Sequence, residues 1–65
     1  MKNRYLIERY FGDHWGIYQH NLSTLKMAKL LIKGFNKLHP DVKLRICRRT
    51  VNGLVVLENN KWIKA

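Results

Sequence analysis

Positively charged side chains are concentrated in one part of this 65-residue sequence. Eight of the 13 Lys and Arg residues fall within 24 consecutive positions: Lys26, Lys29, Lys33, Lys37, Lys43, Arg45, Arg48 and Arg49. The chain has four Asp and Glu residues, so its formal net charge is +9. Lysine attracts phosphate as a point charge, and arginine forms paired hydrogen bonds with phosphate or carboxylate. The pattern therefore favours binding of a polyanion or of an acidic surface.

Residues that could support catalysis or bind a metal are few and widely spaced. The acidic residues belong to separate segments: Glu8, Asp13, Asp41 and Glu58. We expect each of them to offset a neighbouring Lys or Arg. The possible metal ligands lack C-x₂-C or H-x₃-H spacing: His14, His20, His39 and Cys47. Phosphate-loop, nucleophile-elbow and zinc-protease motifs are absent from the sequence, so we predict a protein that is not an enzyme and has no metal or cofactor.

The single cysteine, Cys47, cannot form an internal disulfide, which favours a reducing compartment and predicts a cytoplasmic protein. Neighbouring arginines would favour its thiolate and could make it a nucleophile. No base or second thiol accompanies it, so we favour a structural role in a strand. Uncharged apolar stretches such as Leu30 to Ile32 are far shorter than the roughly 20 residues of a spanning helix, so no membrane partner is expected.

The first twenty residues have the pattern of a β-hairpin. Aromatic and branched residues over 4–11 favour a strand, Gly12 to His14 favour a turn, and a second strand is expected over 15–20. Trp15 and Ile17 should share a face. We expect Trp15 and Phe11 in the core.

A helix is predicted from a cap at Asn21 or Ser23 to about His39, next to Pro40. At 100° per residue, the apolar residues of the expected core face cover an arc of about 140°: Leu25, Ala28, Leu31, Ile32, Phe35 and Leu38. The four helix lysines cover about 80° on the opposite side. Met27 and Leu30 lie between the two arcs and form a candidate partner-binding pair.

Residues 41–50 alternate between an apolar and a basic face, as in a strand with one side buried. Asn52-Gly53 is typical of a two-residue turn, and a turn centred there would place Cys47 opposite Glu58. Arg48 would then fall on the apolar face, so it lies at the sheet rim or a bulge shifts the register. Trp62 and Ile63 extend the last strand or cover an edge.

Together these elements predict one small domain over residues 1–65. Its fold class is α+β, a two-layer β-β-α-β-β arrangement with one amphipathic helix on a mostly antiparallel sheet.

The eight clustered cations have two functional interpretations, in addition to the interpretation that they only keep the surface solvated. Solvated helix faces usually mix Glu with Lys, whereas this helix has no acidic residue between Ser23 and His39. We therefore predict a non-enzymatic module that engages nucleic acid, DNA or RNA, through the eight cations. The alternative is a protein-binding module, in which Met27 and Leu30, rimmed by lysines, dock on an acidic partner. An edge strand could also pair with a second copy.

Several segments of the chain look similar to small phage accessory proteins. The resemblance is carried by Trp15-Gly16-Ile17-Tyr18, by Asn21 to Leu25 with Ala28, and by Pro40 before Arg45-Ile46-x-Arg48. This layout resembles phage-encoded inhibitors of bacterial RNA polymerase built from one helix on a small sheet. It implies a protein that binds host transcription or nucleic-acid machinery, with Arg45, Arg48 and Arg49 touching an acidic surface. The lysine-rich helix departs from those relatives, whose helix tends to be acidic. An RNA–DNA hybrid-binding module is a weaker match.

Overall fold

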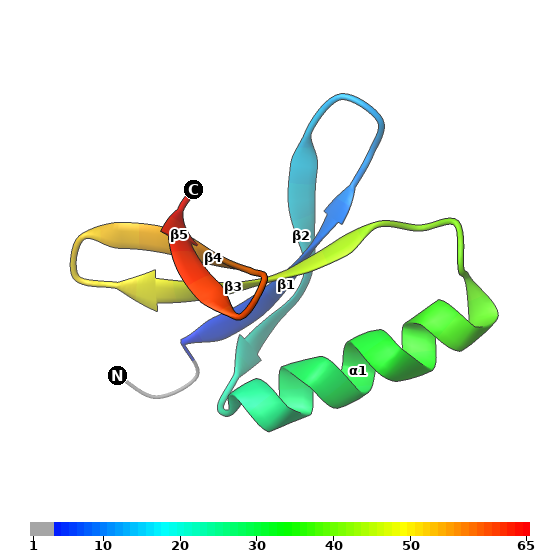
Figure 1. Ribbon diagram of the computed structural model, residues 1–65, viewed down its shortest axis with the longest axis horizontal. Coiled ribbons are helices and arrows are strands. Elements are labelled where there is room, and N and C mark those ends of the chain that lie inside the picture. The colour runs from blue at the N-terminus through cyan, green and yellow to red at the C-terminus, as the bar shows by residue number, and fades with distance from the viewer. Residues whose placement is uncertain (1–3) are drawn as a thin grey trace.

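The computed structural model describes residues 4–65 and contains one helix against a five-stranded sheet (Figure 1). In chain order the elements are β1 (Tyr5–Tyr10), β2 (Trp15–Leu22), α1 (Leu25–Leu38), β3 (Leu44–Thr50), β4 (Gly53–Glu58) and β5 (Lys61–Lys64). The strands lie in the order β2-β1-β3-β4-β5, and every neighbouring pair is antiparallel. The predicted α+β class is confirmed. The C-terminal residues add a strand of their own, because Asn59 and Asn60 adopt positive φ and turn the chain back onto β4.

The first hairpin forms where the sequence predicts it. The amide of Phe11 donates to the carbonyl of His14 at 2.8 Å, and Gly12 takes a φ of 96° inside this turn. Phe11 itself is exposed, which corrects its expected place in the core, because it lies past the end of β1 where no second layer covers it.

The cap of helix α1 lies one residue after Ser23 and three residues after Asn21, the two predicted caps. Thr24 is the cap, and its hydroxyl oxygen accepts a hydrogen bond from the Met27 amide at 3.1 Å. Asn21 instead belongs to β2, with a φ of 61°. At the other end the amide of His39 donates to the Phe35 carbonyl, directly before Pro40.

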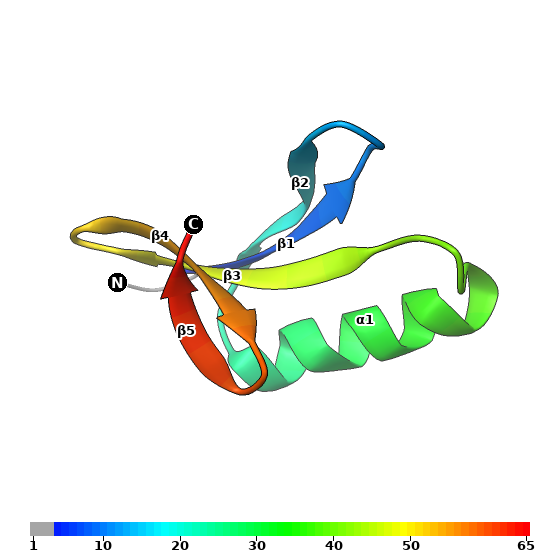
Figure 2. The same ribbon diagram turned by 45° about the horizontal axis from the view of Figure 1, so that its top comes forward.

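The helix packs on the sheet through a narrower face than the sequence predicts. A core of Ile7, Leu22, Ala28 and Ile46 is joined by partly buried residues that include Leu25, Ile32, Leu57 and Trp62. Leu31 is 43% exposed and Leu38 is 78% exposed, so their predicted place in the core is wrong. For Leu38 the reason is visible in Figures 1 and 2, where the C-terminal half of α1 runs out beyond the strands. Leu31 lies near the edge of the predicted apolar arc, away from its centre.

The β3–β4 hairpin differs from its predicted register. Its turn is Val51-Asn52, Thr50 pairs with Gly53, and Cys47 therefore faces Val56 instead of Glu58. The Thr50 hydroxyl fixes this turn by accepting from the Asn52 amide and donating to the Gly53 carbonyl. The β3 pairings show no shift, so Arg48 stays on the helix-side face without a bulge.

A second, smaller core lies on the sheet face that α1 does not cover. Leu6, Cys47 and Val56 are buried there, with Leu54 packed against them. Alternation along β1 and β3 places these residues opposite Ile7 and Ile46, which face the helix. Both faces of the sheet therefore contain buried apolar side chains. No helix among residues 4–65 is long and apolar enough to cross a membrane.

Candidate nucleic-acid interface

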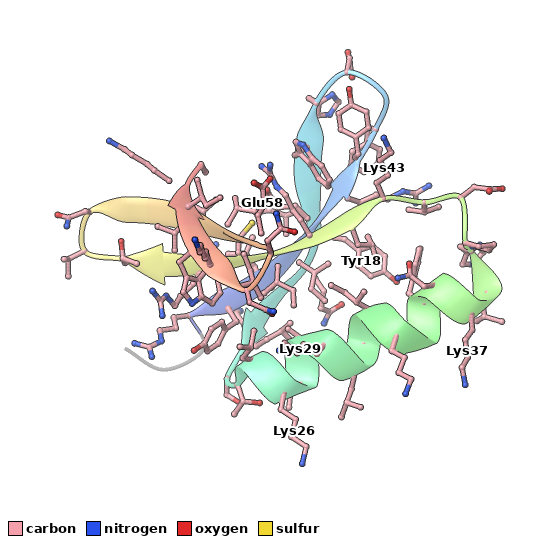
Figure 3. The ribbon with its side chains drawn as sticks, viewed as in Figure 1. Tyr18, Lys26, Lys29, Lys37, Lys43 and Glu58 are labelled. Atoms are coloured by element: carbon pink, nitrogen blue, oxygen red, sulfur yellow. The ribbon has the colours of Figure 1, made fainter. Side chains whose placement is uncertain are left out.

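Four exposed lysines, here named the lysine flank, run along one side of α1: Lys26, Lys29, Lys33 and Lys37. They cover about 80° of the helix circumference. Figure 3 shows Lys26 and Lys37 pointing away from the sheet into solvent. The sequence of α1, LKMAKLLIKGFNKL, contains no acidic residue. The flank is therefore a row of ammonium groups without a carboxylate on the same helix.

Neighbouring contacts show which way the lysine flank faces. On one side of the helix, Phe35 contacts Tyr18 of the edge strand β2, with 5.0 Å between ring centroids. On the other side, Leu25 belongs to the cluster that includes Trp62 of β5. Around the helix axis, Leu25 lies at the edge of the core face, and the lysines follow it in the direction away from Phe35. The lysine flank therefore lies on the β5 side of the helix. Both views in Figures 1 and 2 place β5 beside the first turns of α1.

Two further cations, not singled out from the sequence, belong to the last strand. Lys61 and Lys64 belong to β5 and are exposed. Lys61 shares the sheet face of Ile63, opposite α1, and Lys64 lines a pocket with Thr50 and Asn52 at the β3–β4 turn, so neither joins the lysine flank. Their placement depends on the β4–β5 hairpin. The signal in the sequence was Asn59-Asn60, a pair that tolerates positive φ and marks a turn.

Three arginines, here named the arginine cluster, converge at the end of β3. Arg4, Arg48 and Arg49 line one pocket of about 350 Å³ together with Thr50 and Val51. The Arg49 amide donates to the Arg4 carbonyl at 2.8 Å, which brings the residue before β1 next to the predicted pair. Arg4 could not be assigned from sequence, because this placement requires the β1–β3 pairing in which Tyr5 faces Arg48.

Arg48 is held in place by an aromatic side chain. Its guanidinium carbon lies 4.4 Å from the centroid of the Trp62 ring, and Trp62 contacts Tyr5 at 6.2 Å between centroids. Its Nε is buried and has no hydrogen-bond partner among residues 4–65. Such stacking contributes about 0.5–2 kcal/mol and fixes the plane of the guanidinium. The group is thereby oriented before any anion binds.

Arg45, in contrast, is engaged inside the protein. Its Nε donates to Oε1 of Glu8 at 2.8 Å, its second guanidinium nitrogen lies 2.7 Å from the same oxygen, and its guanidinium stacks on Trp15 at 4.2 Å. The two side chains are 25% and 11% exposed. The interpretation that Glu8 offsets a neighbouring cation is confirmed, and Arg45 is removed from the surface available to a ligand.

Lys43 also lies apart from the lysine flank. Its ammonium group is 5.9 Å from the ring centroid of Tyr10, and Figure 3 places it near the β1–β2 hairpin. The eight predicted cations are therefore divided. The structure groups the four helix lysines on one flank and Arg48 with Arg49 at the end of β3, while Lys43 and Arg45 stand outside both groups.

Cys47 is fully buried, and its thiol donates to Oε1 of Glu8 at 3.3 Å. Burial, reinforced by this hydrogen bond and by the charge of Glu8, raises the pKa of Cys47 to about 12. The thiol is therefore neutral at physiological pH, which supports the structural role and contradicts an activated nucleophile. In the range the structure describes, no three His, Cys, Asp or Glu side chains are grouped to hold a metal ion.

Apolar side chains, here named the helix stripe, are exposed on α1 beside the lysine flank: Met27, Leu30, Leu31 and Leu38. The predicted partner-binding pair belongs to it, with Met27 45% and Leu30 60% exposed. Met27 and Leu30 were predicted to be exposed, whereas Leu31 and Leu38 were expected in the core.

Comparison of the chain with protein-family models, with curated proteins and with solved structures finds no match. The resemblance to phage inhibitors of RNA polymerase therefore stays a prediction.

Proposed function

We propose that this protein is a non-enzymatic nucleic-acid-binding domain that holds phosphates with the lysine flank and the arginine cluster. The observation that carries the proposal is a helix with four exposed lysines and no acidic residue. Among residues 4–65, no carboxylate forms an ion pair with these lysines; Glu8 contacts Arg45, and Asp13 contacts His14.

The arrangement of the lysines has a small energetic cost in the free protein. Lysines three or four positions apart repel each other, by about 0.2–0.5 kcal/mol per pair. Lys26, in the first turn, is also placed unfavourably at the positive end of the helix dipole. Bound phosphates would relieve both effects. A row of ammonium groups does not distinguish bases, so this surface supplies affinity without sequence preference.

Fluorescence anisotropy with labelled single-stranded and duplex DNA and RNA tests this function. We expect micromolar binding at about 50 mM salt that weakens by orders of magnitude at about 200 mM salt. The double variant Lys29→Gln/Lys33→Gln should bind several-fold more weakly, and Lys43→Gln, which lies apart from the flank, serves as the control. Absence of binding to all four probes at the lower salt concentration would overturn the proposal.

A second candidate function is supported by the helix stripe. Exposed Met27 and Leu30 next to lysines fit a docking surface for an acidic protein, as a phage-type inhibitor or adaptor in the host cytoplasm would need. Pull-down from a bacterial lysate should then retain one partner after nuclease treatment, and Met27→Ser/Leu30→Ser should release it. Loss of the captured material on nuclease treatment points back to nucleic acid. A homodimer would instead use β2 or β5, the two edge strands, and would appear in sedimentation as twice the monomer mass.

A further inference from the structure

The sheet face opposite α1 contains a pocket of about 410 Å³, here named the sheet pocket. Its walls are the apolar side chains of Leu6, Ile17 and Leu54 with Glu8, and Arg49 and Thr50 lie at the end of β3. The volume is within the range of roughly 300–1,000 Å³ typical of sites for small ligands. Leu6 and Leu54 belong to the core cluster on this face, so the pocket wall is part of the packed structure.

One side of the sheet pocket is formed by the carboxylate of Glu8, a hydrogen-bond acceptor that its neighbours hold in place. Oε1 of Glu8 receives the two contacts from Arg45 and the thiol contact from Cys47. All of the hydrogen bonds recorded for this carboxylate within residues 4–65 go to that one oxygen. Its second oxygen therefore retains its acceptor capacity, while Arg45 and Cys47 hold the side chain in position. A ligand group that donates a hydrogen bond is the chemical complement of this wall.

Arg49 connects the sheet pocket with the arginine cluster. The same residue, with Thr50, lines both the 410 Å³ pocket and the 350 Å³ pocket that Arg4 and Arg48 share. An apolar cavity with a hydrogen-bond acceptor therefore adjoins a pocket lined by three arginines. That combination fits a ligand with a flat, largely apolar ring bearing N–H donors and a phosphate attached nearby.

We propose that the sheet pocket receives one unstacked base of a single-stranded nucleic acid whose backbone phosphate lies on the arginine cluster. This inference rests on the proposed nucleic-acid-binding function and assigns it a substrate class. The base packs between Ile17 and Leu54, and its exocyclic amino group donates to Glu8. A base within a duplex is stacked on both sides and cannot enter, so the single strand is the preferred form.

The acceptor also predicts which base is favoured. The N4 amino group of cytosine donates to a carboxylate, whereas thymine presents the O4 acceptor at the equivalent position and is repelled. Oligo(dC) should bind more tightly than oligo(dT) of equal length. The backbone charge is the same in both, so this difference reports the pocket and not the phosphate contacts.

The test uses labelled oligo(dC), oligo(dT) and an abasic strand of equal length, measured by anisotropy at low salt. Ile17→Trp fills the pocket mouth, and Ile63→Trp is the matched control, because both isoleucines are exposed, at 55% and 44%, and Ile63, in β5, does not line the pocket. The wild type and the control should bind oligo(dC) about tenfold more tightly than the abasic strand. Ile17→Trp should bind the two strands equally, with its affinity for the abasic strand unchanged.

Two different failures can be told apart. Equal, salt-sensitive binding of all three strands by the wild type, unchanged in Ile17→Trp, overturns the base pocket and leaves phosphate binding standing. Absence of binding to every strand overturns both proposals. Circular dichroism of Ile17→Trp and Ile63→Trp confirms that each variant keeps the fold in which the comparison is made.

Discussion

Removal of the Glu8 carboxylate should destabilise the protein strongly. In Glu8→Ala, Arg45 loses the partner of its two short contacts and the Cys47 thiol loses its acceptor. Breaking a buried ion pair on one side costs about 3–5 kcal/mol. Arg45 is a quarter exposed and keeps its stacking on Trp15, so we expect a smaller loss than that of a fully buried pair, about 2–3 kcal/mol. Domains of this size have about 3–10 kcal/mol of stability in total.

Urea unfolding followed by tryptophan fluorescence measures this loss, since Trp15 lies against Arg45. Arg45→Ala and the double variant complete a mutant cycle, and the two residues should show a coupling energy of about 1–3 kcal/mol. Glu58→Ala is the control, because Glu58 is exposed and its loss should change stability by less than about 0.5 kcal/mol. If Glu8→Ala also changed stability by less than about 0.5 kcal/mol, or if the effects of the two single variants simply added up in the double variant, the stabilising role of the Glu8–Arg45 pair would be refuted.

Two further predictions concern stability and reactivity. Gly34→Ala should raise the free energy of unfolding by about 1 kcal/mol in a thermal melt, because Gly34 lies inside α1 and a Cβ there meets no atom within 4 Å; a decrease would contradict this packing. The Cys47 thiol should resist a thiol reagent in the folded protein and react once urea unfolds it. The pKa of Cys47 rises from 9.0 to about 12 on folding, so the neutral thiol favours the folded state. Its contribution to the free energy of unfolding is fully present below pH 9.0 and is lost as the pH rises from there through about 12. At about pH 10 the loss amounts to about 1 kcal/mol, which Cys47→Ala should abolish.

The elements encoded by short-range signals were predictable from sequence. The glycine turn of the first hairpin, the apolar period of the helix and the stop at Pro40 each act within a few residues. The β3–β4 register was not predictable, because Asn52-Gly53 fits more than one turn. The Thr50 hydroxyl bonds select the turn one position earlier.

The candidate site was predicted only in part, because local geometry determines some of its residues and long-range strand pairing determines the others. Residues on one helix face share a surface by local geometry, so the lysine flank follows from spacing alone. Whether Arg45 faces solvent or an acid depends on β1 pairing with β3, which places Glu8 opposite it. The exposure of Leu38 likewise depends on how far the helix extends past the sheet, a length that no local pattern contains.

The salt dependence of binding tests the central claim most directly. Five phosphates neutralised on a single strand give a slope of log K against log salt of about −3.5. Replacing all four lysines of the flank with glutamine should bring that slope about 3 units closer to zero. A wild-type slope near zero, or a slope that the fourfold variant leaves unchanged, would contradict phosphate binding by α1.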